Sequence, residues 1–300
     1  MEACHFRSLR LITQHTNSDL PPSSKSPFRG RQVRWLTSRG LLSGPRSICI
    51  SRMAASSFAS ADSSNSEGFG RVPSDFTEVI VVRHGETTWN ACGKIQGHLD
   101  IELNDIGRHQ AAAVGDRLSK EYSVSAIYSS DLKRAYETAQ IIAKSCALPE
   151  VKKDARLRER HLGDLQGVVF REASKLKTKA YQAFVSPKTD QEVPGGGESL
   201  DQLYDRATSG LEEIAAKHKG EQIVVVTHGG ALRALCKRAG RSAPRGSPQG
   251  KVLNTSISIF HLSNSHWIIK RWGDVGHLDR TGFLESGFGG DRHSVLRQGN

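Results

Sequence analysis

The chain has 300 residues, enough for one or two domains, and its 42 lysines and arginines outnumber its 31 acids, giving a formal net charge of +11. No segment interleaves aromatic with basic side chains as nucleic-acid readers do, and no apolar run approaches the roughly 18 residues of a membrane helix. We therefore exclude nucleic acid and membrane as expected partners, and we expect the basic balance to suit a small anionic molecule.

The first 74 residues differ in composition from the rest of the chain. Residues 1–70 contain eight arginines but only four acids, and serine is frequent among them. Leaders that are rich in arginine and serine and poor in acids are typical of organelle transit peptides. We expect residues 1–74 to be a disordered leader that serves as a transit peptide for a plastid or mitochondrion, with a plain disordered tail as the alternative. Met53 could itself be a start site, and a chain begun there would stay in the cytosol.

Strand-like and helix-like patterns alternate between residues 75 and 275, the region that we expect to form the folded domain. The alternation favours an α/β three-layer sandwich with a mainly parallel central sheet flanked by helices. Strands are expected at 79–82, 126–128 and 223–227, with a further pair at 255–261 and 266–271. Helices are expected at 108–120 after the cap Asn104, from the cap Ser129-Ser130-Asp131 to about 144, from 198–200 onward, and at 231–239.

The two β-branched runs at 79–82 and 223–227 are each followed by a histidine and a glycine. The first leads into Arg83-His84-Gly85, and the second into His228-Gly229-Gly230. In open α/β sheets, ligands bind at the carboxyl ends of the strands. Two imidazoles and a guanidinium at one edge can hold a phosphate group and attack it. The pattern therefore predicts a site for phosphoryl transfer.

Four ordered motifs resemble those of the histidine phosphatases, also called the phosphoglycerate mutase-like superfamily, and the resemblance extends from about residue 78 to 275. The motifs are Arg83-His84-Gly85-Glu86-Thr87-Thr88-Trp89-Asn90, Ser129-Ser130-Asp131-Leu132-Lys133-Arg134-Ala135, Leu157-Arg158-Glu159-Arg160-His161-Leu162-Gly163 and Thr227-His228-Gly229-Gly230. A single Arg-His-Gly tripeptide would be weak evidence, whereas four motifs in this order and spacing are specific.

The resemblance implies a role for each residue of a catalytic set. His84 would attack phosphorus and carry the phosphoryl group, which a neutral imidazole can do without a metal-activated water. Arg83, Arg134 and His228 would stabilise the charge on the equatorial oxygens. Glu159 would be the general acid, which protonates the leaving oxygen and later activates water.

Four further residues are expected to bind the substrate. Asn90 and the backbone around Gly229 would donate hydrogen bonds to the phosphate oxygens, and Gln96 and Gly97 would touch the substrate, although Gly97 could serve only to shape a turn. The five cysteines and the other histidines show no metal-ligand spacing, so we expect no metal site and no cofactor.

Two stretches of the chain are less regular than the remainder. Weak helical patterns around 169–184 give way to Pro187 and then to Pro194-Gly195-Gly196-Gly197. We expect residues 163–197 to be an insertion over the active site. Residues 276–300 are rich in glycine, and we expect them to form a loose C-terminal tail.

Mutases and phosphatases of this family would share the chemistry and differ in the segment after the general acid. The resemblance implies that mutases carry a lysine and an arginine pair there, whereas this chain has Val168-Val169-Phe170-Arg171-Glu172 and no arginine pair. We therefore predict a metal-independent phosphomonoesterase for small phosphorylated metabolites such as sugar phosphates, phosphoserine or phosphoglycerate, with a homodimer as one option for its assembly. The alternatives are a phosphoglycerate mutase and a phosphate-binding scaffold without turnover, which the complete catalytic set disfavours.

Overall fold

The computed structural model describes residues 72–240, 252–263 and 266–278. Nearly all of the expected leader, residues 241–251 and the region beyond residue 278 lie outside the described residues. The 3-10 helix Gly276–Leu278 falls inside the expected tail, and Leu278 is fully buried, so these three residues belong to the fold. No helix of the described ranges is long and apolar enough to cross a membrane.

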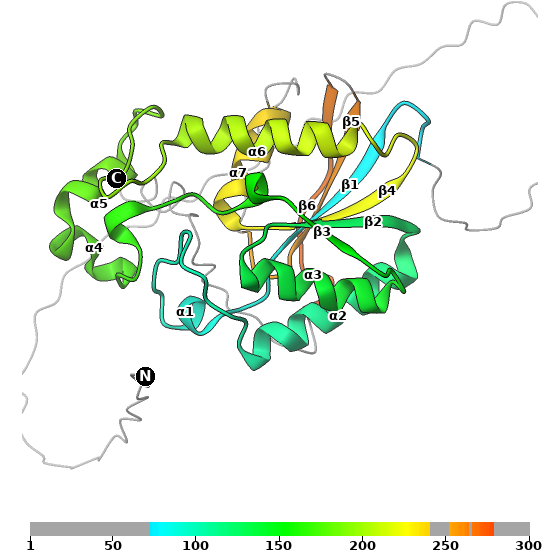
Figure 1. Cartoon of the computed structure of the whole chain (residues 1–300), viewed down its shortest axis with the longest axis horizontal. Coiled ribbons are helices and arrows are strands. Elements are labelled where there is room, and N and C mark those ends of the chain that lie inside the picture. Colours follow the sequence, from blue (N-terminus) through cyan, green and yellow to red (C-terminus); the bar gives the residue numbers. More distant parts are fainter. Residues whose placement is uncertain (1–71, 241–251, 264–265, 279–300) are drawn as a thin grey trace, which may run out of the picture. The chain divides into compact units, whose positions relative to one another are not determined.

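Within these ranges, six strands form one sheet in the order β3-β2-β4-β1-β5-β6 (Figure 1). The strands are β1 (Thr77–Arg83), β2 (Val124–Ser129), β3 (Val151–Lys153), β4 (Gln222–Thr227), β5 (Ile257–Ser263) and β6 (His266–Asp274). The pairings among β3, β2, β4 and β1 are parallel, whereas β5 and β6 join antiparallel. The mainly parallel sheet agrees with the prediction. The strand β3 was not predicted, because three residues that include two exposed lysines carry no periodic hydrophobic signal.

Helices cover both faces of this sheet, which makes the three layers (Figure 1). Side chains alternate along β1: Val79 and Val81 pack against one set of helices, and Ile80 and Val82 against the other. The first set is α6 (Leu200–Ala215) and α7 (Gly229–Gly240), and the second is α2 (Asp105–Glu121) and α3 (Lys133–Ser145). Strands that are buried on both faces explain why β1 and β4 are continuous apolar runs.

The helix starts test the predicted caps. Asn104 caps α2, because its Oδ1 accepts the amide of Gly107 at 2.8 Å, and Ser199 caps α6 with a full capping box. The prediction for α3 was wrong: its N-cap is Leu132, whose side chain makes no capping bond, and the first amide of the helix, that of Lys133, donates instead to the carboxylate of Asp100 at 2.6 Å. The polar side chains before α3 have distant partners instead, since Ser130 contacts His228 and Asp131 pairs with Arg158.

Residues 163–197 contain α4 (Phe170–Leu176) and α5 (Thr178–Val185), which follow the 3-10 helix Gly163–Leu165. They build a small apolar cluster of their own in which Phe170, Leu165 and Val193 are buried together with Ile95. Ile95 comes from the segment after the short helix α1 (Thr88–Ala91), and Lys94 forms a β-bridge with Val169. The expected insertion is therefore a helical unit that packs on the loop following the first histidine motif.

The loop within the first histidine motif that carries Gly85 and Glu86 rests directly on the first turn of α2. A Cβ atom built on Gly107 would lie 2.1 Å from the carbonyl oxygen of Glu86, so a side chain there must push the loop away. We expect Gly107→Ala to lower the free energy of unfolding by about 3 kcal/mol, the upper range for overpacking. Gly93→Ala is the control for a glycine in open space: a Cβ atom built there has no atom within 4 Å, and its positive φ of 65° adds only about 1 kcal/mol of backbone strain.

Urea denaturation of the two variants and the parent chain measures both effects. Equal losses in Gly107→Ala and Gly93→Ala would contradict the close contact between this loop and α2.

Candidate active site

The parallel pairing of β1 with β4 brings the two predicted histidines together. Arg83 and Thr227 are opposite each other in the register, so the next residues, His84 and His228, leave the sheet side by side. Their ring centroids lie 5.1 Å apart with the planes tilted by 55°. Both side chains are buried, at 3% and 0% exposure. Placing two imidazoles this close at a sheet edge is the central feature of the site.

A backbone contact fixes the tautomer of His84. Its Nδ1 lies 2.7 Å from the carbonyl oxygen of Gly85, and because a carbonyl only accepts, Nδ1 must carry the hydrogen. The lone pair is then on Nε2, which is the atom available for attack. Burial, followed by the charges of Arg134 and Arg83, lowers the pKa of His84 well below its usual range. The ring is therefore neutral at physiological pH, as the predicted role of nucleophile requires.

His228 is held by a different contact. Its Nε2 lies 2.9 Å from the hydroxyl of Ser130, and its buried Nδ1 has no hydrogen-bond partner among the described residues. Burial, followed by the positive charges around the ring, that of Arg134 first, lowers the pKa of His228 well below its usual range. A dianionic phosphate would counter those charges and supply the acceptor that Nδ1 lacks.

Two buried guanidinium groups surround the imidazoles. Arg83 and Arg134 are each 1% exposed, and Arg83 Nη1 donates to the carbonyl of Val252. Arg134 donates to the carbonyls of Gly97 at 2.7 Å and Leu99 at 2.9 Å, so it also holds the loop that they belong to. Burial lowers the pKa of Arg134 to about 10, which leaves it protonated at pH 7. The site therefore carries a concentrated positive charge.

Glu159 approaches from the irregular segment after the 3-10 helix Ala155–Leu157. One carboxylate oxygen accepts the amide of Arg160 at 2.8 Å, and the other accepts the amide of Gly230 at 3.0 Å. A Cβ atom on Gly230 would lie 2.3 Å from that carboxylate, so the first turn of α7 admits Glu159 only because residue 230 is glycine. The backbone around Gly229 was expected to donate to substrate, and the next amide, that of Gly230, donates to Glu159.

The four predicted substrate contacts have different surroundings. Asn90 closes a capping box on α1, with its Oδ1 accepting the amide and hydroxyl of Thr87, so that oxygen holds the loop. Gln96 is 8% exposed, and its Oε1 has no hydrogen-bond partner in the described ranges. Gly97 has φ of 54°, and a Cβ there would meet Gln166, so the turn itself requires glycine. Gly229 is the first residue of α7. Their contacts with substrate stay predictions.

The structure adds supports that the sequence did not reveal. Asn254 donates its side-chain amide to the carbonyl of His84 at 2.9 Å, and Thr255 donates its backbone amide to the carbonyl of Arg83 at 3.0 Å. Thr255 has φ of 54°, a left-handed conformation that costs a threonine on the order of 1–3 kcal/mol. This loop before β5 therefore stores strain where it supports the backbone of His84. No local pattern marks it, because its partners lie about 170 residues away.

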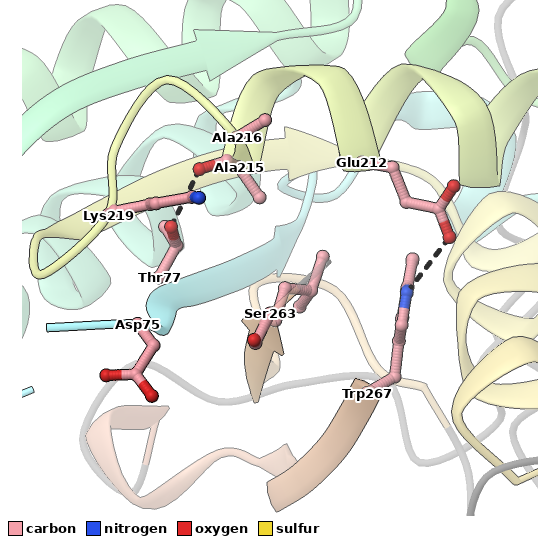
Figure 2. A pocket seen from close by; sticks show the side chains of 9 residues that line it. Asp75, Thr77, Glu212, Ala215, Ala216, Lys219, Ser263 and Trp267 are labelled. Carbon is pink, nitrogen blue, oxygen red and sulfur yellow. Dashed lines mark hydrogen bonds between the residues drawn. The ribbon is translucent and has the colours of Figure 1, made fainter. Parts of the chain in front are cut away.

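A pocket of about 160 Å³ lies elsewhere in the fold (Figure 2). Its lining includes Thr77, which donates to the carbonyl of Ala215, and Trp267, which donates to Glu212 at 3.1 Å. Thr77 begins β1 and His84 follows it, so about seven residues of extended chain, roughly 23 Å, separate this pocket from the imidazoles. The pocket contains none of the predicted site residues. Within the described ranges, no three His, Cys, Asp or Glu side chains gather as metal ligands would.

The lowered pKa values predict the pH dependence of this site. The folded pKa values of His84 and His228 lie below that of a free imidazole, so both rings stay neutral as the pH falls through 6.5. We expect kcat/KM to show no loss from protonation of His84 as the pH falls below 6.5. The free energy of unfolding should decline over the same range, because the unfolded chain binds protons that the folded chain does not. Nitrogen-15 NMR of the imidazoles checks the assignment independently of the substrate phosphate, which titrates near pH 6. Half-protonation of either ring near pH 6.5 would contradict it.

Fold and site together define an α/β enzyme that transfers phosphoryl groups through histidine. The model of the histidine phosphatase superfamily (branch 1) matches residues 79–275. The chain belongs to this superfamily, which confirms the family resemblance seen in the four motifs.

Two relatives from Arabidopsis thaliana cover almost the same region. The chain is 62% identical over 221 residues to phosphoglycerate mutase-like protein 4, covering 73% of this chain and 95% of the relative. It is 52% identical over 221 residues to a metal-independent phosphoserine phosphatase, covering 74% of this chain and 91% of the relative. Both identities are high enough to place this chain beside them in the family.

A solved structure confirms the fold. A mutant phosphoserine phosphatase from Entamoeba histolytica, in complex with phosphoserine, aligns with a TM-score of 0.57 and 28% identity. The alignment covers 67% of this chain and 99% of that chain. The predicted α/β class with a mainly parallel sheet is therefore confirmed.

Proposed function

We propose that the chain is a metal-independent phosphoserine phosphatase that works through a phosphohistidine on His84. The observation that carries this proposal is the pair of buried imidazoles 5.1 Å apart, both with lowered pKa and both beside Arg83 and Arg134. One neutral ring can attack phosphorus while the second ring and two guanidinium groups neutralise the phosphoryl oxygens.

The reaction has two balanced steps. In the first, the Nε2 lone pair of His84 forms a bond to phosphorus, the ester P–O bond breaks, and Glu159 gives its proton to the leaving oxygen. In the second, water attacks the phosphohistidine, the P–N bond breaks, and the carboxylate of Glu159 takes a proton from that water. Free phosphate leaves, and both residues return to their starting states.

Phosphoserine as the substrate is supported by the printed activity of the 52% identical relative and by the ligand of the Entamoeba structure. A mutase is the second candidate, because the 62% identical relative is named phosphoglycerate mutase-like. The segment after Glu159 favours hydrolysis. Val168 and Phe170 pack into the cluster beneath α4 and α5, so this stretch offers Arg171 as its single cation rather than a pair.

The test is phosphate release by the purified chain from phosphoserine, 3-phosphoglycerate and sugar phosphates, each with and without EDTA. We expect phosphoserine to give the highest kcat/KM and EDTA to change no rate. A parallel assay follows interconversion of 3- and 2-phosphoglycerate. Interconversion faster than hydrolysis of every monoester would favour the mutase, and loss of activity in EDTA with recovery in magnesium would overturn the metal-free mechanism.

A further inference from the structure

We propose that Arg206 is a positioning residue that holds Glu159 in place for proton transfer, with Glu198 as its anchor. The inference rests on the proposed function, in which Glu159 is the general acid. Arg206 lies on α6, and its side chain is 21% exposed beside a Glu198 side chain that is 19% exposed. Neither residue is among those expected to touch the substrate.

Arg206 uses all five of its N–H donors in this one cluster. Nε and Nη2 form a fork on the carboxylate of Glu198, the Nη2 bond being 2.8 Å. Nη1 donates to the carbonyls of Arg156 at 2.9 Å and Arg158 at 2.8 Å, and Nη2 also donates to the carbonyl of Glu159 at 2.7 Å. A single planar cation therefore collects three carbonyls of the segment that carries the acid.

These carbonyls need a partner from outside the segment. The 3-10 helix ends at Leu157, and the residues after it, through Leu162, have no regular secondary structure to satisfy their backbone. The anchor is tied to the same segment, because Glu198 Oε2 accepts the amide of His161 at 2.8 Å and its carbonyl accepts from Arg160 Nε at 2.9 Å. The segment is thus held on both sides by the Arg206–Glu198 pair.

Backbone placement decides where the carboxylate of Glu159 lies. Its carbonyl is fixed by Arg206 and also by Nε2 of His98 at 2.6 Å, while its carboxylate reaches the amide of Gly230. A displacement of about 1 Å between a catalytic group and its target can cost on the order of 100-fold in rate. Loss of the three carbonyl bonds would permit such a displacement without removing any group that contacts the substrate.

Lysine is the informative replacement for Arg206. It keeps the positive charge and much of the stem, but its ammonium has three donors in place of five and no planar fork. We expect Arg206→Lys to lower kcat for phosphoserine on the order of 10–100-fold, with KM changed by less than about threefold. The matched control is Arg238→Lys, which alters another arginine–glutamate pair, Arg238 with Glu212, at the opposite end of α7 from Gly230.

The leaving group separates a positioning role from a general loss of structure. p-Nitrophenolate leaves without help from an acid, so we expect Arg206→Lys to change the burst rate constant for nitrophenolate release from p-nitrophenyl phosphate by less than about threefold. Adding Arg206→Lys to Glu159→Gln should produce no further loss on phosphoserine, because the group being positioned is already unable to give its proton. Equal slowing on both substrates, or an additive loss in the double variant, would overturn the inference.

Hydrogen exchange gives a readout that does not depend on activity. The amides of Arg160 and His161 bond the carboxylates of Glu159 and Glu198, so Arg206→Lys should speed their exchange while β1 and β4 stay protected. Unchanged exchange at these two amides would overturn the clamp. A parent chain that releases phosphate from neither substrate would instead overturn the proposed function, which keeps the two failures distinct.

Discussion

We expect His84→Ala to lower turnover of phosphoserine by at least about 10⁴-fold and to abolish the phosphoenzyme, because the variant lacks the nitrogen that attacks the phosphate ester in the first step of the proposed mechanism. The lost ring is neutral, so the charges of Arg83 and Arg134 that hold the phosphate remain. Affinity for inorganic phosphate should therefore change by only a few fold. Quenching in base, which preserves phosphohistidine, and sequencing the labelled peptide by mass spectrometry measure the first effect.

The neighbouring His228 makes this experiment a real test. Its pKa is also lowered, and it is equally buried, so electrostatics alone do not choose between the two rings. The hydrogen bonds differ in what they fix: the Gly85 carbonyl can only accept from Nδ1 of His84, which places the lone pair on Nε2, whereas the Ser130 hydroxyl can donate to or accept from Nε2 of His228 and fixes no tautomer. A label on the peptide of residue 228 would reverse the assignment. His109→Ala, which removes an exposed histidine of α2, is the control and should keep full activity.

Local signals explain the parts of the fold that could be predicted from sequence. β1 and β4 are β-branched runs buried on both faces, and Asn104 and Ser199 are short polar caps whose partners lie three residues away. Patterns of this kind are complete within a few residues. The serines and the aspartate before α3 look the same locally, yet Ser130 is bonded to His228 from 98 residues away. Tertiary contact therefore overrode the cap that the sequence favoured.

The same distinction separates the predicted and unpredicted parts of the site. The four motifs identified the two imidazoles, the two arginines and Glu159, because each belongs to a recognisable run of residues. Gly230 lies in the fourth motif and Arg206 in none, but no motif shows what either does for Glu159, since their importance depends on contacts across 71 and 47 residues. A glycine in the first turn of a helix and an arginine on an amphipathic helix are ordinary until the fold brings Glu159 against them.

Glu159→Gln should show how the site divides its work between the nucleophile and the acid. The amide keeps the shape of the side chain, and its oxygen can still accept from Gly230, but it cannot deliver a proton. We expect kcat for phosphoserine to fall on the order of 10²–10³-fold, because the serine alkoxide is a poor leaving group. For p-nitrophenyl phosphate, the rate constant of the first step, in which nitrophenolate leaves, should fall far less. Burst kinetics on the aryl ester separate that step from hydrolysis of the phosphohistidine.

A burst of nitrophenolate is expected in Glu159→Gln because Glu159 also acts as the base in the second step. Once nitrophenolate has left quickly, the phosphohistidine must wait for water that no carboxylate activates, so phosphoenzyme should accumulate to near one equivalent per site. Glu159→Asp is the matched variant, because it keeps a carboxylic acid on a shorter side chain. Proton transfer should be slower in this variant, and phosphoserine should still be slowed more than p-nitrophenyl phosphate. Equal slowing of both substrates by Glu159→Gln, with no accumulated phosphoenzyme, would remove Glu159 from the acid and base roles and leave its contact with Gly230 as a structural one.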